Sequence, residues 1–266
     1  MDVYKAETNQ IGYETSESQL EINQPISFYL NNIIEGINLS DSLSCLLELI
    51  NLTRFNIEDI EIKSEFFDKI TLIINALFQF PICILPNSKP NVYSDEGDIE
   101  IDSVCKKSEY VTILHYSITT IKLMWKNVNQ IPEILINEGI IQGLISLLIY
   151  LHQSSTISYN SDQRNLLYIT QTQYNHFFSD ILTSLSFLLH NHPETLFIQF
   201  NPLFFQCLHD VIIPLIPKST YSLDSLSSRK FISCLCENDQ VLSILHESPD
   251  FFKILVSYLK TDNFNI

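Results

Sequence analysis

Apolar residues recur at intervals of three and four through most of this 266-residue chain, and that spacing limits the folds open to it. Proline-marked starts such as Asn201-Pro202 and Ser248-Pro249 suit helices, because a proline at the first position leaves no N–H unpaired. Strand signals are weak, so the sequence predicts an all-α fold. Three runs place their apolar residues on one helical face: Phe66, Ile70, Ile73, Ile74 and Leu77; Val111, Leu114, Ile118, Ile121 and Trp125; and Phe177, Ile181, Leu185 and Leu188.

The chain divides into a tail and one domain that carries two long loops. Residues 1–24 are acidic and lack a sustained apolar period, which predicts a flexible N-terminal tail. Residues 25–262 are predicted to form a single helical domain. Within it, residues 80–108 contain three prolines and the acidic run Asp95 to Asp102, and residues 153–171 are rich in Ser, Asn, Gln and Tyr. Both segments are predicted as long surface loops.

Four segments open a helix in the same register. They begin at Glu65, Gly139, Leu203 and Asp250, and the second, third, sixth and tenth residues of each are apolar. Another apolar helix ends shortly before each start, and a break with a short helix, such as 132–137 or 193–200, lies between. The repeating unit is therefore a long helix, a turn, a short helix, a sharp bend and a second long helix.

This unit resembles the armadillo repeat, most closely in the segments 121–148 and 185–212. The first of these ends in Ile-Pro-Glu-Ile-Leu-Ile-Asn-Glu-Gly-Ile-Ile-Gln-Gly-Leu-Ile-Ser-Leu-Leu. The resemblance covers roughly residues 40–260 and implies a right-handed α-solenoid of about four irregular repeats. Its concave face would be lined by helices at about 41–53, 109–127, 173–190 and 224–236. The first two repeat spacings exceed the about 40–47 residues of the family, and the two loops supply the excess.

Armadillo-like proteins bind other proteins on the concave face, so the resemblance implies a non-enzymatic scaffold or adaptor. The asparagine with which peptide-binding members grip an extended peptide stands only at Asn51, and their tryptophan is absent from the matching positions, so recognition of nuclear signals is not expected. For Trp125, core and groove stay equally open. The residues expected to contact a partner are Glu48, Asn51, Lys122, Trp125, Lys126 and Ser184.

Two other functions stay open on the sequence. Small acidic armadillo-type nucleotide-exchange factors of Hsp70 chaperones are similar in size, although no motif here selects them. An α-helical hydrolase would need a nucleophile, a base and an orienting group that converge, and no segment offers them. The chain could also form part of a longer solenoid, because the segment 251–259 would end the stack with little to cap it.

Charge and composition restrict the partners and the compartment. The chain carries 31 acids against 15 bases, a formal net charge of −16, which repels phosphate backbones and anionic lipids. We therefore expect a protein partner and neither nucleic acid nor membrane. No apolar run reaches the about 20 residues of a membrane span, and the scattered cysteines suit reduced thiols in a cytoplasmic or nuclear protein. A functional role for the run Asp95 to Asp102 would require a basic partner.

Residues that could carry chemistry are better explained as structural, and no cofactor or metal is expected. Cys234 and Cys236 are two positions apart on a helix and point in different directions. Cys207, His209 and Asp210 are too close in sequence to converge as a catalytic trio. His190 and His192 suit a helix C-terminus, and Gly139 to Gly143 suits a tight bend.

Overall fold

The computed structural model describes residues 24–53, 63–85, 107–126, 138–156, 166–192, 201–215, 223–237, 239, 242 and 243. This part of the chain is mostly helical, as the sequence predicts. The helices in chain order are α1 (Ile26–Glu35), α2 (Leu39–Thr53), α3 (Ser64–Ala76), the 3-10 turn η2 (Leu77–Gln79), α4 (Lys107–Lys126), α5 (Glu138–Thr156), α6 (Gln171–Asn191), α7 (Asn201–Cys207), the π-helical segment η5 (Leu208–Ile212), α8 (Ile213–Leu215) and α9 (Leu223–Glu237).

The long helices begin and end close to where the apolar period places them. The helices expected at about 41–53, 109–127, 173–190 and 224–236 are α2, α4, α6 and α9. The helix starts expected at residues 65, 139 and 203 are the starts of α3, α5 and α7 at residues 64, 138 and 201. The start expected at residue 250, the short helices at 132–137 and 193–200, the acidic run and all but the last residue of the tail lie outside the described residues.

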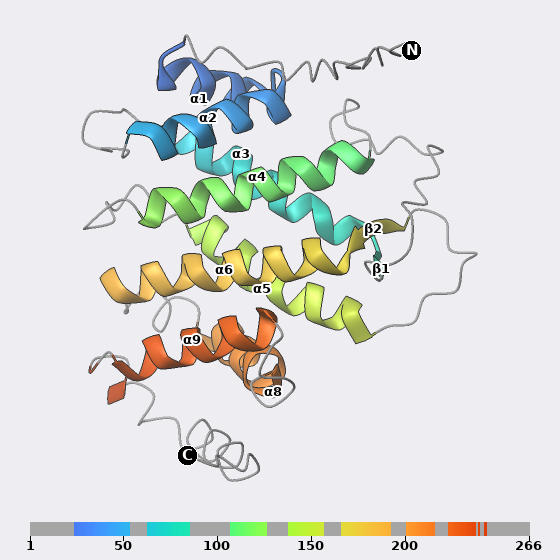
Figure 1. Cartoon of the computed structure of the whole chain (residues 1–266), viewed down its shortest axis with the longest axis vertical. Helices are drawn as coiled ribbons and strands as arrows, with labels where there is room; N and C mark the ends of the chain where they lie inside the picture. The colour runs from blue at the N-terminus through green and yellow to red at the C-terminus, as the bar shows by residue number, and fades with distance from the viewer. Residues whose placement is uncertain are drawn as a thin grey trace, which may run out of the picture.

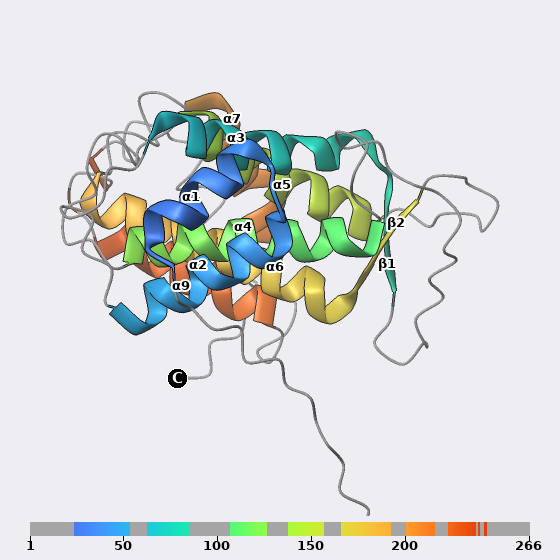
Figure 2. The ribbon, with the colours of Figure 1, turned by 90° about the horizontal axis from the view of Figure 1, so that it is seen from above.

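The helices form two layers that lie side by side. Within each layer, the helices follow one another along the long axis of the molecule (Figures 1 and 2). In one layer, α2, α4, α6 and α9 lie side by side, and each packs against the next. In the other, α3 packs against α5, and α5 against α7, while α1 covers α2 and α3 at one end. Viewed from above, α3, α5 and α7 lie on one side and α2, α4, α6 and α9 on the other (Figure 2).

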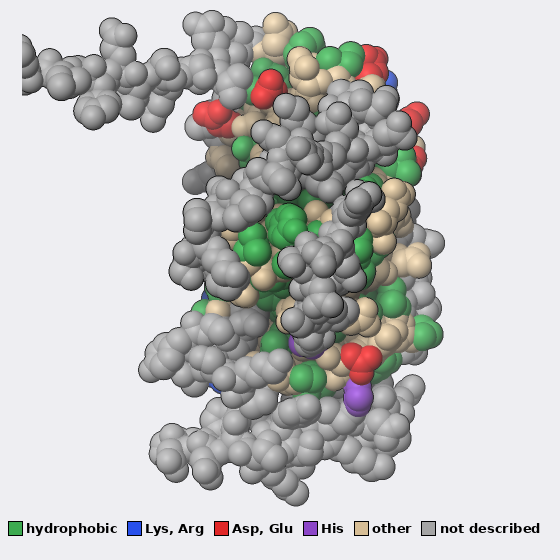
Figure 3. Space-filling model, turned by 90° about the vertical axis from the view of Figure 1, so that its right-hand side faces the viewer, with side chains coloured by type: hydrophobic (Ala, Val, Ile, Leu, Met, Phe, Trp, Pro, Cys, Tyr) green, Lys and Arg blue, Asp and Glu red, His purple; other side chains and the backbone are tan. Residues whose placement is uncertain are grey.

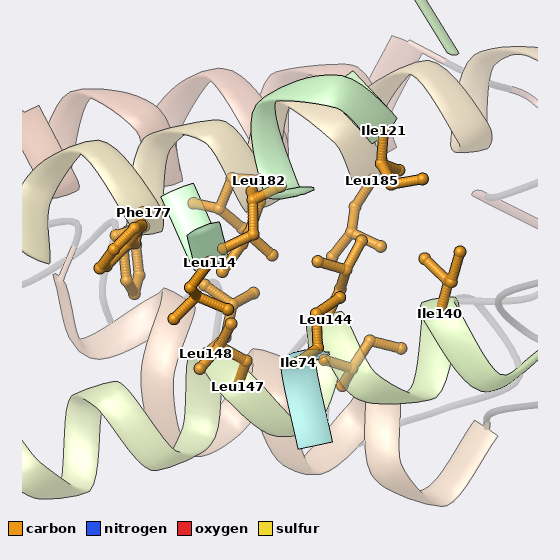
Figure 4. Packing of buried hydrophobic residues seen from close by; sticks show 14 of the residues in the cluster. Ile74, Leu114, Ile121, Ile140, Leu144, Leu147, Leu148, Phe177, Leu182 and Leu185 are labelled. Carbon is orange, nitrogen blue, oxygen red and sulfur yellow. The ribbon is translucent and has the colours of Figure 1, made fainter. Parts of the chain in front are cut away.

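The core lies between the layers, and α5 is its centre. Apolar side chains of α5 meet those of α4 and α6, as Figure 4 shows for Leu144 and Leu148 against Leu114 and Leu182. A helix that is apolar on almost every side must be covered on almost every side. Contacts with α3, α6, α7, η5 and the strand β1 provide that cover. The buried residues of α5 are Ile140, Ile141, Leu144, Ile145, Leu147, Leu148, Ile149 and Leu151.

Two short strands correct the prediction that residues 80–108 and 153–171 are loops throughout. Strand β1 (Ile82–Leu85) pairs in parallel with β2 (Leu167–Thr170), with Ile82 opposite Leu167. Residues 153–156 also belong to α5, and α4 already begins at Lys107. The strands form because buried backbone N–H and C=O groups need partners, and each apolar run finds them in the other.

The strands lie at one end of the helices (Figure 1), and Figure 3 views that side of the molecule. Hydrophobic side chains gather at mid-height on this surface. Partly buried aromatic residues join α5 to η2 and to the segment just before β1. Phe78 and Tyr150 stack edge to face with ring centroids 5.4 Å apart, and the Tyr150 hydroxyl donates to the carbonyl of Phe80 at 2.6 Å.

Local sequence explains several helix ends. Gly36 closes α1 in the left-handed region at φ 77°, which glycine adopts without steric cost. Thr170 and Gln173 cap the start of α6 reciprocally, each side chain accepting from the other residue's backbone N–H. Pro214 lacks the N–H that the carbonyl of Asp210 would receive in an α-helix, which accounts for the wider π-helical turns of η5.

Gly143 corrects the prediction of a tight bend from Gly139 to Gly143. It lies inside α5, where that helix meets α3. A Cβ atom at this position would lie 3.2 Å from Cγ2 of Ile74 and 3.6 Å from Oδ1 of Asn75. The absence of a side chain therefore allows the two helices to approach each other closely.

We predict that Gly143→Val destabilises the protein by about 1–3 kcal/mol, because its side chain would overpack the contact between α5 and α3. The measurement is the free energy of unfolding in urea. The control is Gln142→Val, an exposed neighbour on the same helix that introduces the same side chain without the clash, although only the control loses helix propensity. Equal destabilisation by the two variants would contradict the close approach at Gly143.

Candidate functional site

In the layer of α2, α4, α6 and α9, each helix presents one row of accessible side chains. We call this surface the four-helix face. Each row recurs at three- and four-residue spacing on the side opposite the core, so the rows follow directly from the amphipathic period. The face comprises Asp41, Ser44, Glu48 and Asn51 of α2; Thr112, His115, Tyr116, Thr119, Lys122, Leu123 and Lys126 of α4; His176, Asp180, Thr183, Phe187 and His190 of α6; and Leu223, Leu226, Lys230, Ser233 and Glu237 of α9.

The helices α4, α6 and α9 run parallel in this face. Thr119 contacts Asp180, and His115 lies by His176, so residue numbers rise together along α4 and α6. The hydroxyl of Ser227 on α9 donates to that of Ser179 at 3.0 Å, and further along the thiol of Cys234 donates to the carbonyl of Ser186 at 3.7 Å. Equivalent side chains on the three helices therefore lie in register across the face.

A polar cluster joins α4 to α6 in the middle of the face, centred on the carboxylate of Asp180. Lys122 donates to Oδ1 of Asp180 at 2.6 Å, and the hydroxyl of Thr119 donates to Oδ2 at 3.2 Å. The side chains of Lys122 and Asp180 are only 23% and 14% exposed. Both oxygens of this partly buried carboxylate thus have donors, which offsets the cost of removing it from water.

His115 lies beside this cluster and packs against aromatic rings. Its ring centroid is 5.9 Å from that of Phe177 and 6.4 Å from that of His176. Burial lowers the pKa of His115 below 6.5, and the electrostatic effects of His176 and Lys122 on the charged imidazole act in the same direction. Asp180 opposes them by favouring the charged imidazole.

The six residues expected to contact a partner are distributed between surface and core. Glu48, Asn51 and Lys126 are exposed on the four-helix face, and Lys122 is half-buried in the polar cluster. Glu48 and Asn51 lie on α2, while Lys122 and Lys126 lie one turn apart on α4, so the layer brings these four onto one surface.

Trp125 and Ser184 lie inside the molecule. Trp125 is 1% exposed, which decides for the core between the two alternatives that the sequence leaves open. Ser184 is 0% exposed, and its hydroxyl donates to the carbonyl of Asp180 one turn earlier at 2.8 Å. A small hydroxyl that bonds back to its own helix fits between packed helices, which explains why a polar residue occupies this core position.

Sequence reasoning missed Asp180, Thr119, His115 and His176. Each lies on the polar side of a predicted amphipathic helix, and that position was the only sign in the sequence that these residues are accessible. Their convergence depends on the offset between α4 and α6, which side-chain packing between the layers determines. The spacing of residues within one helix does not predict that offset between helices. Lys122 could therefore be predicted as an accessible residue, but its pairing with Asp180 could not.

The other candidate chemistry does not assemble. Cys207 is 1% exposed, and burial above all raises the pKa of its thiol, while His209 and Asp210 are exposed and pair with each other. Cys234 points toward α6, whereas Cys236 is exposed. Among the residues that the structure describes, no group of three or more His, Cys, Asp or Glu side chains could hold a metal ion. The described helices include none with the length and apolarity needed to cross a membrane.

Comparisons of the chain with protein-family models, with curated proteins and with solved structures find no match in any of the three.

We predict that a double-mutant cycle on Lys122→Met and Asp180→Asn gives a coupling free energy of about 1 kcal/mol, because this ion pair is largely shielded from water. The control cycle uses His209→Gln and Asp210→Asn, whose side chains are 62% and 50% exposed. We expect the control coupling to stay below about 0.5 kcal/mol. Urea unfolding of the single and double variants measures both values, and equal couplings would contradict the shielding of Lys122 and Asp180.

The environment of His115 predicts a pH dependence of stability. A histidine with a lowered pKa in the folded state binds its proton more readily in the unfolded state, so its contribution is complete above pH 6.5 and is lost as the pH falls below that value. We expect the melting temperature to fall less in His115→Phe than in the unsubstituted protein between about pH 7.5 and pH 5.5. Tyr116→Phe, a neighbour on the same face, should keep the full pH dependence. An unchanged slope in His115→Phe would show that this imidazole is not the group responsible.

Proposed function

We propose that this protein is an armadillo-like α-solenoid that works without catalysis, as a scaffold or adaptor that binds a partner protein on the four-helix face. The observation that carries the proposal is the parallel, in-register packing of α4, α6 and α9. Adjacent helices in a simple up-and-down bundle run antiparallel, whereas corresponding helices of stacked repeats run parallel.

The second layer supports the same interpretation. Helices α3, α5 and α7 begin within one or two residues of the positions that the repeat analysis marks as equivalent, and each packs against the next along the stack. A unit in such an array buries its apolar side only against its neighbours. The almost completely buried α5, which packs between α3 and α7, fits an internal unit.

The composition of the four-helix face supports binding. It combines accessible charged side chains such as Glu48 and Lys126 with apolar side chains, among them Leu226 at 44% exposure and the partly buried Leu123 and Phe187. Protein interfaces join apolar contacts at the centre to polar contacts at the rim. The four rows together also provide a longer surface than one helix could. Within the part of the chain that the structure describes, no feature favours an Hsp70 regulator or a hydrolase over the scaffold.

Affinity capture with matched surface variants tests the proposal. We expect the unsubstituted chain to retain at least one protein from a lysate of its source cell at stoichiometric amounts, as judged by mass spectrometry. Glu48→Arg combined with Thr183→Arg, both on the four-helix face, should reduce that retention about tenfold or more, because two bulky cations obstruct the interface.

The control combines Glu65→Arg with Gln142→Arg, which makes similar changes at exposed positions of the other layer. It should retain the partner fully, and circular dichroism should show that both variants are folded. Loss of the partner from the control alone would place the binding surface on the layer of α3, α5 and α7. Capture of no stoichiometric protein would contradict the proposed function as a whole.

A further inference from the structure

Lysines lie on both sides of α6 in the four-helix face, although the chain as a whole is strongly acidic. Lys122 and Lys126 lie on α4 and Lys230 on α9, in a protein whose formal net charge is −16. The contacts of Ser179 with Ser227 and of Lys122 with Asp180 place Lys230 at nearly the same height as Lys122. The face therefore carries a cation on each flank of its central helix.

The described carboxylates of this face do not cancel this arrangement. Asp180 is engaged by Lys122 and Thr119, so its charge is balanced within the cluster. Glu237 lies at the C-terminal end of α9, seven residues and thus about 10 Å beyond Lys230, and it accepts from the hydroxyl of Ser233 at 2.9 Å. The acids Asp41 and Glu48 lie on α2, on the far side of α4.

Apolar side chains lie on the same three helices as the lysines. Phe187 on α6 and Leu123 on α4 are partly buried and pack against the core, and Leu226 on α9 is 44% exposed. An apolar strip between two cationic flanks can accept a segment that is apolar in the middle and acidic toward both ends. Because Ser227 lies beside Ser179 and Cys234 beside Ser186, Leu226 lies about 13 Å short of Phe187 along the helix axes, and Leu123 and Phe187 are the apolar residues nearest to a path from Lys126 to Lys230.

We propose that the four-helix face binds an extended acidic segment of a partner protein, which crosses α6 and places its carboxylates against Lys126 on one flank and Lys230 on the other. This inference rests on the proposed function and adds the chemistry of the partner. Two helix-to-helix spacings of about 8–10 Å separate the flanks, and Lys126 lies about 6 Å beyond Lys122 along α4, so the carboxylates must be about 17–21 Å apart. An extended chain covers that distance in about five or six residues.

Fluorescence anisotropy with labelled peptides tests the geometry directly. The first peptide carries two Glu pairs separated by about five Leu and Ser residues, a separation that matches the span between the flanks. The second has the same composition with all four Glu residues adjacent, and the third has Lys in place of every Glu. We expect the first peptide to bind at least about fivefold more tightly than the second, and the third not to bind.

Charge-reversal variants of the full-length chain identify the surface. Lys126→Glu combined with Lys230→Glu should weaken binding of the first peptide about tenfold, because two attractions become repulsions. Lys63→Glu, an exposed lysine at the start of α3 in the other layer, should leave the affinity unchanged. Tighter binding of the lysine peptide, equal binding of the first two peptides, or equal weakening by Lys63→Glu would each overturn the inference.

The two proposals can fail separately. Suppose that a natural partner no longer binds the Glu48→Arg and Thr183→Arg variant, but binds the Lys126→Glu and Lys230→Glu variant normally and is not displaced by the first peptide. That result would overturn the inference of an acidic segment and leave the scaffold function intact. Displacement of that partner by the first peptide would support both. A single-stranded oligonucleotide that displaces the peptide and is equally sensitive to Lys126→Glu and Lys230→Glu would overturn the inference in favour of a nucleic acid.

Discussion

The burial of α5 is the constraint on which the rest of the structure depends. Its apolar residues surround the helix axis, so no single neighbouring helix can cover them. The chain meets this demand with α3 and α7 in the same layer, α6 across the core and β1 at the end of the helices. Removing any of these would expose apolar area at a cost of about 25 cal/mol per Å². The side-by-side arrangement of α2, α4, α6 and α9 then follows from the need to cover the second layer along its whole length.

Sequence periodicity predicts what depends on one helix alone. The apolar residues from Val111 to Trp125 repeat at helical spacing, and they specify both the presence of α4 and its buried side. The same reasoning gives the starts of α3 and α5 within about one residue, because a change of apolar register marks a new helix. It also identifies the exposed positions Glu48 and Lys126, since the polar row is the complement of the apolar one.

Features that depend on two distant segments could not be predicted in this way. The strands β1 and β2 are four-residue apolar runs, too short to show a period, and each becomes a strand because the other satisfies its backbone. The role of Gly143 depends on its closeness to Ile74, and the role of Lys122 depends on Asp180 across the layer. Trp125 shows the same limit within one helix, because its position near the end of α4 suited core and groove equally.

Net charge is a poor guide to the partner proposed for this protein, because charge acts over short distances in salt solution. At physiological ionic strength an exposed charge is felt over about 8 Å, so a partner bound across α6 senses Lys126 and Lys230 far more than acids elsewhere on the chain. The formal charge of −16 instead governs long-range encounter and repels acidic proteins at a distance. An acidic segment would therefore associate slowly and depend on the contacts made after docking, in which apolar side chains such as Leu123 and Phe187 provide most of the affinity and the lysines fix the position of the segment. Added salt should weaken both electrostatic effects, so that the association rate rises while the positional selectivity falls.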